Sequence, residues 1–98
     1  FKENCPDVRN TKAVDVIHGL EDYSLSVTTF DTWANPDEVK HEYGITSFQT
    51  LDSNKKYDAI VLTVAHNEFL NLNLEDYKKE NAVVFDVKGI LEQYDVRL

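Results

Sequence analysis

The chain has 98 residues, of which 42% are hydrophobic and 29% are charged, as in an ordinary soluble globular domain. This length suits one domain with one modest core, and no apolar run approaches the roughly 20 residues of a membrane span. The net charge of −8 would repel DNA or RNA, and the basic residues form no single block. We therefore expect neither a nucleic-acid partner nor a membrane partner.

The first residues indicate that the chain starts inside a longer protein. There is no initiator methionine, and no charged-then-apolar leader that would direct secretion. Cys5 is the only cysteine, so no internal disulfide can form. These features fit a fragment of a cytoplasmic protein.

The first half of the chain carries signals for two helices. Residues 3–10 are typical of a loop, and Asn10 can cap a helix over 11–23, where apolar residues recur at helical spacing. A second helix starts after the cap Asn35 with Pro36 and stops at Gly44. The β-rich residues 25–31 predict a strand, and residues 45–48 a short one.

The second half carries two buried-strand signals. Residues 58–65 and 82–87 are nearly continuous apolar runs, rich in β-branched residues. Such runs indicate strands covered on both faces, as in a parallel sheet under helices. Between them, Asn73 can cap a short helix over 74–80.

Alternating strands and helices predict an α/β fold: a three-layer, Rossmann-like, open and mainly parallel sheet with helices on both faces. One strand is missing from this account. Phe1 is expected to be its last residue.

In open parallel sheets, ligands bind beyond the carboxyl ends of the strands. Four segments meet this description: Phe1-Lys2 onward, Asp31 onward, Ala65-His66-Asn67 and Asp86-Val87-Lys88. The chain has neither G-x-G-x-x-G nor a P-loop, so a dinucleotide or triphosphate held by a glycine-rich turn is not expected.

Two lysines stand out at this edge. Lys2 and Lys88 each follow a predicted strand and can reach the same crevice, where a lysine serves as a point charge for phosphate. Both can equally be solvated surface residues.

The other reactive residues have simpler interpretations. His18 and His41 are expected on helix surfaces and no metal site is expected, whereas His66 either helps to cap the next turn or contacts a ligand. Cys5 has no neighbouring histidine to activate it, so it is interpreted as incidental. Asp7 and Arg9 are expected to pair locally and hold their loop in shape.

Several segments, in order, resemble the UDP-glucose/GDP-mannose dehydrogenase family. The opening matches F-K-x-x-x-x-D-x-R-x-[ST]. The further matches are Phe30-Asp31-Thr32-Trp33, residues 38–45, residues 57–61, His66-Asn67-Glu68-Phe69, residues 85–91 and residues 95–98. The likeness covers essentially the whole chain and is greatest to the branch that oxidises UDP-N-acetylhexosamines.

The resemblance implies that residues 1–98 are the C-terminal UDP-sugar-binding domain of an NAD-dependent dehydrogenase. Family members oxidise the sugar C6 alcohol to a carboxylate, for surface polysaccharides such as capsule, with NAD bound by a separate N-terminal domain. The family's catalytic cysteine lies in a glycine-rich motif that is absent from this chain, and its catalytic lysine and asparagine are also outside this chain. This fragment is therefore expected to be inactive, and the full-length enzyme to be a homo-oligomer.

The resemblance also points to three substrate-binding residues: Phe1, Lys2 and Lys88. The family's F-K pair, which contacts the UDP-sugar, matches Phe1 and Lys2, and the basic residue after the last strand matches Lys88. The UDP-glucose branch has two arginines where this chain has Lys88-Gly89, which favours an N-acetylhexosamine substrate. Arg9 matches an arginine interpreted as mainly structural.

Two other functions remain open from the sequence. A receiver-like α/β signalling or interaction module would use Asp31 and Lys88, although no pair of acids follows a first strand to hold Mg²⁺. The domain could instead serve mainly in subunit packing.

Overall fold

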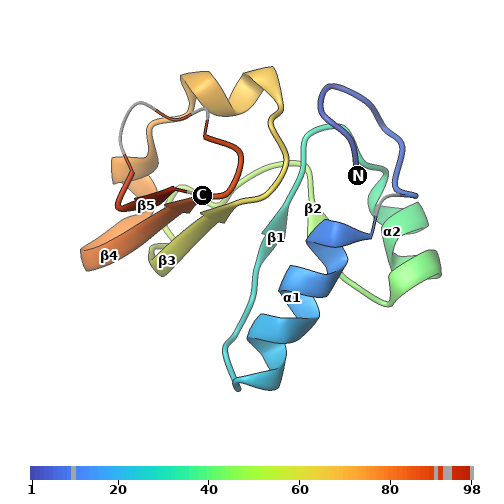
Figure 1. The fold of residues 1–98 in the computed structure, drawn as a ribbon, viewed down its shortest axis with the longest axis horizontal. Coiled ribbons are helices and arrows are strands. Elements are labelled where there is room, and N and C mark those ends of the chain that lie inside the picture. Colours follow the sequence, from blue (N-terminus) through green and yellow to red (C-terminus); the bar gives the residue numbers. More distant parts are fainter. Residues whose placement is uncertain (10, 90, 92–93, 98) are drawn as a thin grey trace. The chain divides into compact units, whose positions relative to one another are not determined.

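The computed structural model describes residues 1–9, 11–89, 91 and 94–97. Contacts divide the chain into two compact units, Phe1–Leu51 and Asp52–Leu98, which are described here one after the other. Parallel strands and helices occur along the chain, which confirms the α/β class (Figure 1). Among the described residues, no helix has the length and apolar character to cross a membrane.

The first unit contains a strand–helix–strand element. Strand β1 (Thr29–Phe30) is followed by helix α2 (Pro36–Tyr43) and strand β2 (Ser47–Phe48), and the two strands pair in parallel. The pairing extends one residue further, where the Asp31 amide donates to the Phe48 carbonyl at 2.9 Å. The strand predicted over 25–31 is thus much shorter than expected, as residues 25–28 lie outside it.

Helix α2 begins and ends as its sequence predicts. The Asn35 side chain accepts hydrogen bonds from the Asp37 amide at 2.9 Å and the Glu38 amide at 3.4 Å. Gly44 ends the helix with φ of 69°, in the left-handed region that glycine tolerates best. On its inner face the Val39 side chain is fully buried, which ties the helix to the core of the unit.

Helix α1 spans Lys12–Asp22, in agreement with the helix predicted over 11–23. Val14 is its buried residue, and Val16 is exposed. The predicted cap Asn10 lies outside the described residues. The apolar core of residues 1–51 consists of Phe1, Val8, Val14, Ala34, Val39 and Ile45.

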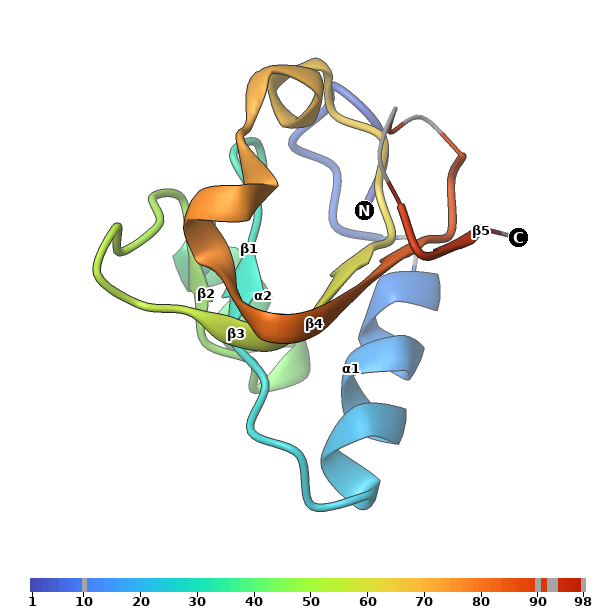
Figure 2. The same ribbon diagram turned by 90° about the vertical axis from the view of Figure 1, so that its left-hand side faces the viewer.

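The second unit holds a three-stranded parallel sheet in the order β3-β4-β5 (Figure 2). Its strands are β3 (Tyr57–Leu62), β4 (Lys78–Asp86) and β5 (Val96–Arg97). Two short 3₁₀ helices, η1 (Asn67–Asn71) and η2 (Leu74–Tyr77), connect the first two strands. The helix predicted over 74–80 is therefore wrong in its second half, since β4 begins at Lys78.

Strand β4 starts earlier than its apolar run because it contains an irregularity. Tyr57 pairs with Lys78, but the next pair is Ala59 with Val83, so β4 has extra residues between the two pairs. Asn81 lies among them with φ of 65°, a conformation that asparagine adopts more readily than most residues. The polar stretch before Ala82 therefore belongs to the strand although its sequence is not typical of one.

The sheet of the second unit is not buried on both faces, contrary to the expectation. Ile60 and Val84 share one face, on which Val84 is only 2% exposed. The opposite face carries Val61 and Val83, which are 36% and 44% exposed. An apolar run thus predicts a strand correctly, but it does not fix how many of its faces are covered within this chain.

Candidate functional site

The segment before α1 folds into a tight turn that leaves Lys2 at the surface. Lys2 and Cys5 form an antiparallel bridge, and Asn4 has φ of 53°, as a turn of this kind requires. Phe1 is not in a strand but is buried, whereas Lys2 is exposed. The segment thus has an apolar anchor followed at once by an exposed positive charge.

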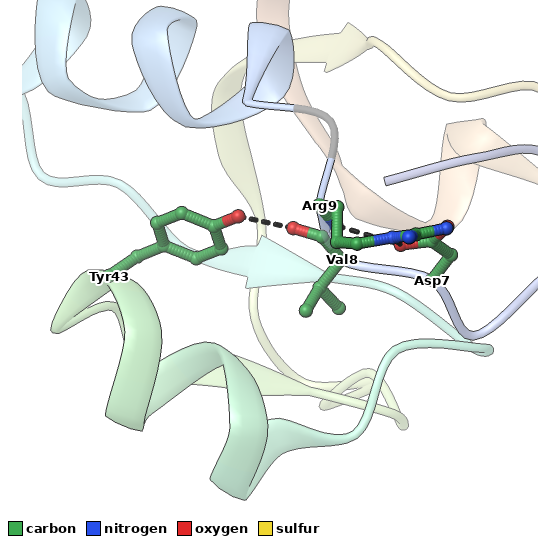
Figure 3. Close-up of polar contacts among 4 residues, drawn as sticks. All are labelled: Asp7, Val8, Arg9 and Tyr43. Atoms are coloured by element: carbon green, nitrogen blue, oxygen red, sulfur yellow. Dashed lines mark hydrogen bonds and ion pairs between the residues drawn. The ribbon is translucent and has the colours of Figure 1, made fainter.

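Tyr43, at the end of α2, holds this segment in place (Figure 3). Its hydroxyl donates a hydrogen bond to the carbonyl of Val8, a residue that is 2% exposed. Its ring also lies 6.2 Å, centroid to centroid, from the ring of Phe1. One side chain therefore fixes both ends of the segment that carries Lys2.

Asp7 and Arg9 pair locally, as predicted. The Arg9 guanidinium donates from Nε to Oδ1 at 3.0 Å and from Nη2 to Oδ2 at 2.7 Å, and the Arg9 amide donates to Oδ1 at 2.9 Å (Figure 3). The hydrogen bonds from Arg9 lower the pKa of the Asp7 carboxyl far below its ordinary value. Arg9 is therefore committed to shaping the loop.

In the second unit, the loop after β4 is organised by Asp86, which is fully buried. Its Oδ1 accepts from the amides of Lys88 at 3.1 Å and Gly89 at 2.7 Å, and its Oδ2 accepts from the Leu91 amide at 2.8 Å. Lys88 itself is exposed. The carboxylate thus sets the backbone from which the Lys88 side chain projects.

Among the residues that the structure describes, Lys2 and Lys88 differ from the other lysines because their side chains have no bound partner. Across the described residues, neither side chain forms an ion pair or hydrogen bond. Partners are instead found for Lys40 (Gly44 carbonyl), Lys55 (Tyr57 ring), Lys56 (Asp76 carbonyl), Lys78 (Glu75) and Lys79 (Asp58). In a chain of net charge −8, two exposed ammonium groups that have no partner in the described part of the chain are available to an anion. Because Lys2 and Lys88 belong to different units, their convergence on one ligand stays a prediction.

His66 occupies the N-cap position of η1, but its side chain makes no capping hydrogen bond there. The turn is closed by its carbonyl, which accepts from the Phe69 amide at 3.1 Å. The imidazole is 1% exposed and lies 5.2 Å, centroid to centroid, from the Phe69 ring. His66 thus helps to cap the turn through its backbone carbonyl, while its ring packs against Phe69.

Asp31 forms a turn in the same way as Asp86. It is 5% exposed, and its Oδ1 accepts from the amides of Trp33 and Ala34, both at 2.8 Å. A phosphoacceptor aspartate must present its carboxylate to a phosphodonor, so this geometry does not favour a receiver-like role. In the part of the chain that the structure describes, no three His, Cys, Asp or Glu residues form a group able to hold a metal ion.

The second unit also has a hollow of about 480 Å³, lined by both polar and apolar side chains. Its lining residues are Phe69, Leu70, Leu72, Asn73, Leu74, Glu75, Lys78, Val84, Leu91, Tyr94 and Asp95. Lys88 does not line it, and the charge of Lys78 is paired with Glu75 at 3.2 Å. The hollow therefore lacks a charge suited to a phosphate and is not assigned to the nucleotide.

Comparison with known proteins identifies close relatives over the whole chain. Residues 1–93 match the family described as "UDP-glucose/GDP-mannose dehydrogenase family, UDP binding domain". The chain is 45% identical to the UDP-N-acetyl-D-glucosamine 6-dehydrogenases of Pseudomonas aeruginosa and Salmonella typhi, and 37% identical to Protein CapL of Staphylococcus aureus.

All of this chain is aligned in each case, but it spans only 24%, 24% and 23% of the length of these three relatives. Solved structures offer no significant match.

Proposed function

Because this chain belongs to the UDP-glucose/GDP-mannose dehydrogenase family, we propose that residues 1–98 are the C-terminal UDP-sugar-binding domain of a larger NAD-dependent 6-dehydrogenase. The complete enzyme oxidises the C6 alcohol of a UDP-N-acetylhexosamine, or of UDP-glucose, to a carboxylate for surface polysaccharide synthesis. The relatives named as UDP-N-acetyl-D-glucosamine 6-dehydrogenases favour the N-acetylhexosamine.

The observation that carries this proposal is the state of Lys2 and Lys88. The resemblance points to these two lysines, and across the described residues both are exposed without a side-chain partner. A diphosphate approaching a chain of net charge −8 needs local positive charge to offset the unfavourable field. We propose that the two ammonium groups bind the diphosphate of the UDP-sugar as point charges.

Phe1 has a different part in the proposed site. Its ring is 7% exposed and close to Tyr43, so it acts from within the core and fixes the direction in which Lys2 leaves the backbone. The proposed domain contributes no catalytic residue. NAD is bound by another domain of the complete protein, since this chain has no glycine-rich dinucleotide turn.

The rest of the proposal concerns the complete protein. We propose that it is a cytoplasmic homo-oligomer in which the sheets of this domain belong to a three-layer Rossmann-like arrangement. The exposed valines on one face of β3 and β4 support a further layer, because an apolar sheet face is normally covered.

Calorimetric titration tests the proposed site. The 98-residue chain and the complete protein are titrated with UDP and UDP-N-acetylglucosamine, with NAD as the control ligand for the chain. Lys2→Ala and Lys88→Ala are each expected to weaken UDP binding by about tenfold, equivalent to roughly 1.4 kcal/mol. Lys79→Ala is the matched control, because Lys79 is exposed but already pairs with Asp58 at 3.3 Å.

The results separate the possible readings. Binding by the complete protein but not by the 98-residue chain means that other domains complete the site. Equal effects of all three alanine variants would show that only overall charge matters, and this would refute the assignment of Lys2 and Lys88. An absence of UDP binding to the complete protein would refute the proposed function.

A further inference from the structure

The loop after β4 is folded around a carboxylate from its own strand. The Asp86 side chain is 0% exposed, and it accepts hydrogen bonds from the backbone amides of Lys88, Gly89 and Leu91. Gly89 has φ of 71°, which a residue with a Cβ adopts only with strain. The path of residues 86–89 therefore depends on one buried side chain and one glycine.

In this turn, the backbone amides of Lys88, Gly89 and Leu91 donate to a carboxylate of the protein itself. Successive backbone amides that point at a common centre bind phosphate in many proteins. Here the centre is occupied by Asp86, so the amides of Lys88, Gly89 and Leu91 are not available to a nucleotide. The group that this turn still offers to a phosphate is the exposed ammonium of Lys88.

The same device occurs in the first unit without a lysine. Asp31 ends the β1 pairing, is 5% exposed, and accepts from two backbone amides at 2.8 Å, those of Trp33 and Ala34. Both aspartates are thus buried and accept hydrogen bonds from backbone amides of the residues that follow. They differ because a lysine follows only Asp86. Asp31 is therefore a matched control for any effect that arises only from loss of stability.

From this geometry we infer that Asp86 is a positioning residue for the nucleotide-sugar, acting through Lys88. The inference rests on the proposed function, because it requires Lys88 to contact the ligand. Asp86 holds the Lys88 backbone so that the ammonium group stays where the diphosphate binds. Without the carboxylate, the loop samples other conformations, and only a fraction of molecules presents the charge correctly.

A double-mutant cycle on the complete dehydrogenase tests this inference. Asp86→Asn keeps one acceptor oxygen and replaces the other oxygen with an NH₂ group, which then opposes a backbone N–H donor. This change loosens the loop without emptying the site. The variants Asp86→Asn, Lys88→Ala, the double variant and Asp31→Asn are compared for KM of the UDP-sugar, kcat and melting temperature.

We expect Asp86→Asn to raise KM about tenfold in the parent protein, which retains Lys88. In the Lys88→Ala background the same change is expected to raise KM less than about twofold, because contacting residues are coupled. Asp31→Asn is expected to lower the melting temperature similarly and to leave KM within about twofold. Equal KM effects of Asp86→Asn in both backgrounds, or an equal effect of Asp31→Asn, would overturn the inference. If Lys88→Ala leaves KM unchanged, the assignment of Lys88 to the substrate fails, and the inference fails with it.

A second variant covers the case in which Asp86→Asn does not fold. Gly89→Ala retains the carboxylate but strains the same turn, since φ at this position is 71°. It is expected to raise KM in the parent protein, which retains Lys88, and to have little effect on KM in the Lys88→Ala background. A KM that stays at the parent value would contradict the positioning role.

Discussion

The hydroxyl of Tyr43 donates a hydrogen bond to the backbone carbonyl of Val8, 35 residues earlier in the chain. This bond joins the end of α2 to the segment that carries Lys2, and the Phe1 ring lies beside the same tyrosine. The conformation of a proposed ligand-binding loop thus depends on a helix that follows it later in the chain.

Removing the Tyr43 hydroxyl is expected to destabilise the first unit. Tyr43→Phe keeps the ring but leaves the buried Val8 carbonyl without this donor, at a cost of about 1 kcal/mol. In a domain of this size such a loss lowers the melting temperature by roughly 4–8 °C. Tyr23→Phe is the control, since Tyr23 is 84% exposed. Equal melting temperatures for the two variants would show that the bond does not contribute.

Two glycines are expected to respond to alanine with opposite signs. Gly44 ends α2 with φ of 69°, so Gly44→Ala strains the backbone and is expected to cost about 1 kcal/mol. Gly19 lies inside α1, where an added Cβ would meet nothing within 4 Å. Gly19→Ala is therefore expected to stabilise the chain by about 0.5–1 kcal/mol. Chemical denaturation measures both, and a loss of stability in both variants would contradict the account of α1.

The buried face of α2 provides a test of the core. Val39 is 0% exposed, so Val39→Ala removes two buried methyl groups and leaves a cavity, at a cost of about 2 kcal/mol. Val16→Ala in α1 is the comparison, because Val16 is 37% exposed and its truncation is expected to cost under about 0.5 kcal/mol. The free energy of unfolding from urea titration gives both values. A similar loss for the two variants would mean that Val39 is not a core residue.

The sequence predicts α2 well because all of its signals are local. A cap, a first-turn proline and a terminal glycine act within a few residues of one another, so the pattern determines the helix without its surroundings. The start of strand β4 could not be predicted from local signals of this kind. Its irregular start depends on pairing with β3 and on the left-handed conformation of Asn81, which are properties of two segments together.

The same distinction applies to the candidate site. Lys88 follows the end of β4 as predicted, whereas Phe1, before Lys2, is not in the strand that was expected there. The pairing of Asp7 with Arg9 follows from their spacing. The role of Tyr43 could not be predicted, since its partner lies 35 residues away. Asp86 had a weak signal, an aspartate at a strand end three residues before a glycine, but sequence alone does not show where its carboxylate points.

The Asp7–Arg9 pair predicts a pH dependence of stability. The hydrogen bonds from Arg9 lower the pKa of Asp7 in the folded chain below the ordinary value of 3.8. A carboxyl with a lowered folded-state pKa stabilises the fold fully above its unfolded-state pKa, and this contribution declines as the pH falls below it. Asp7→Asn is therefore expected to be less stable than the parent at pH 7, with a difference that shrinks as the pH is lowered below about 4.

The effect is expected to be small and to diminish in 1 M salt, because the Arg9 side chain is 89% exposed. Thermal unfolding between pH 7 and pH 2.5 measures the difference, and Arg9→Gln should reproduce it. A stability difference that grows towards acid would show that the pair does not stabilise the folded loop.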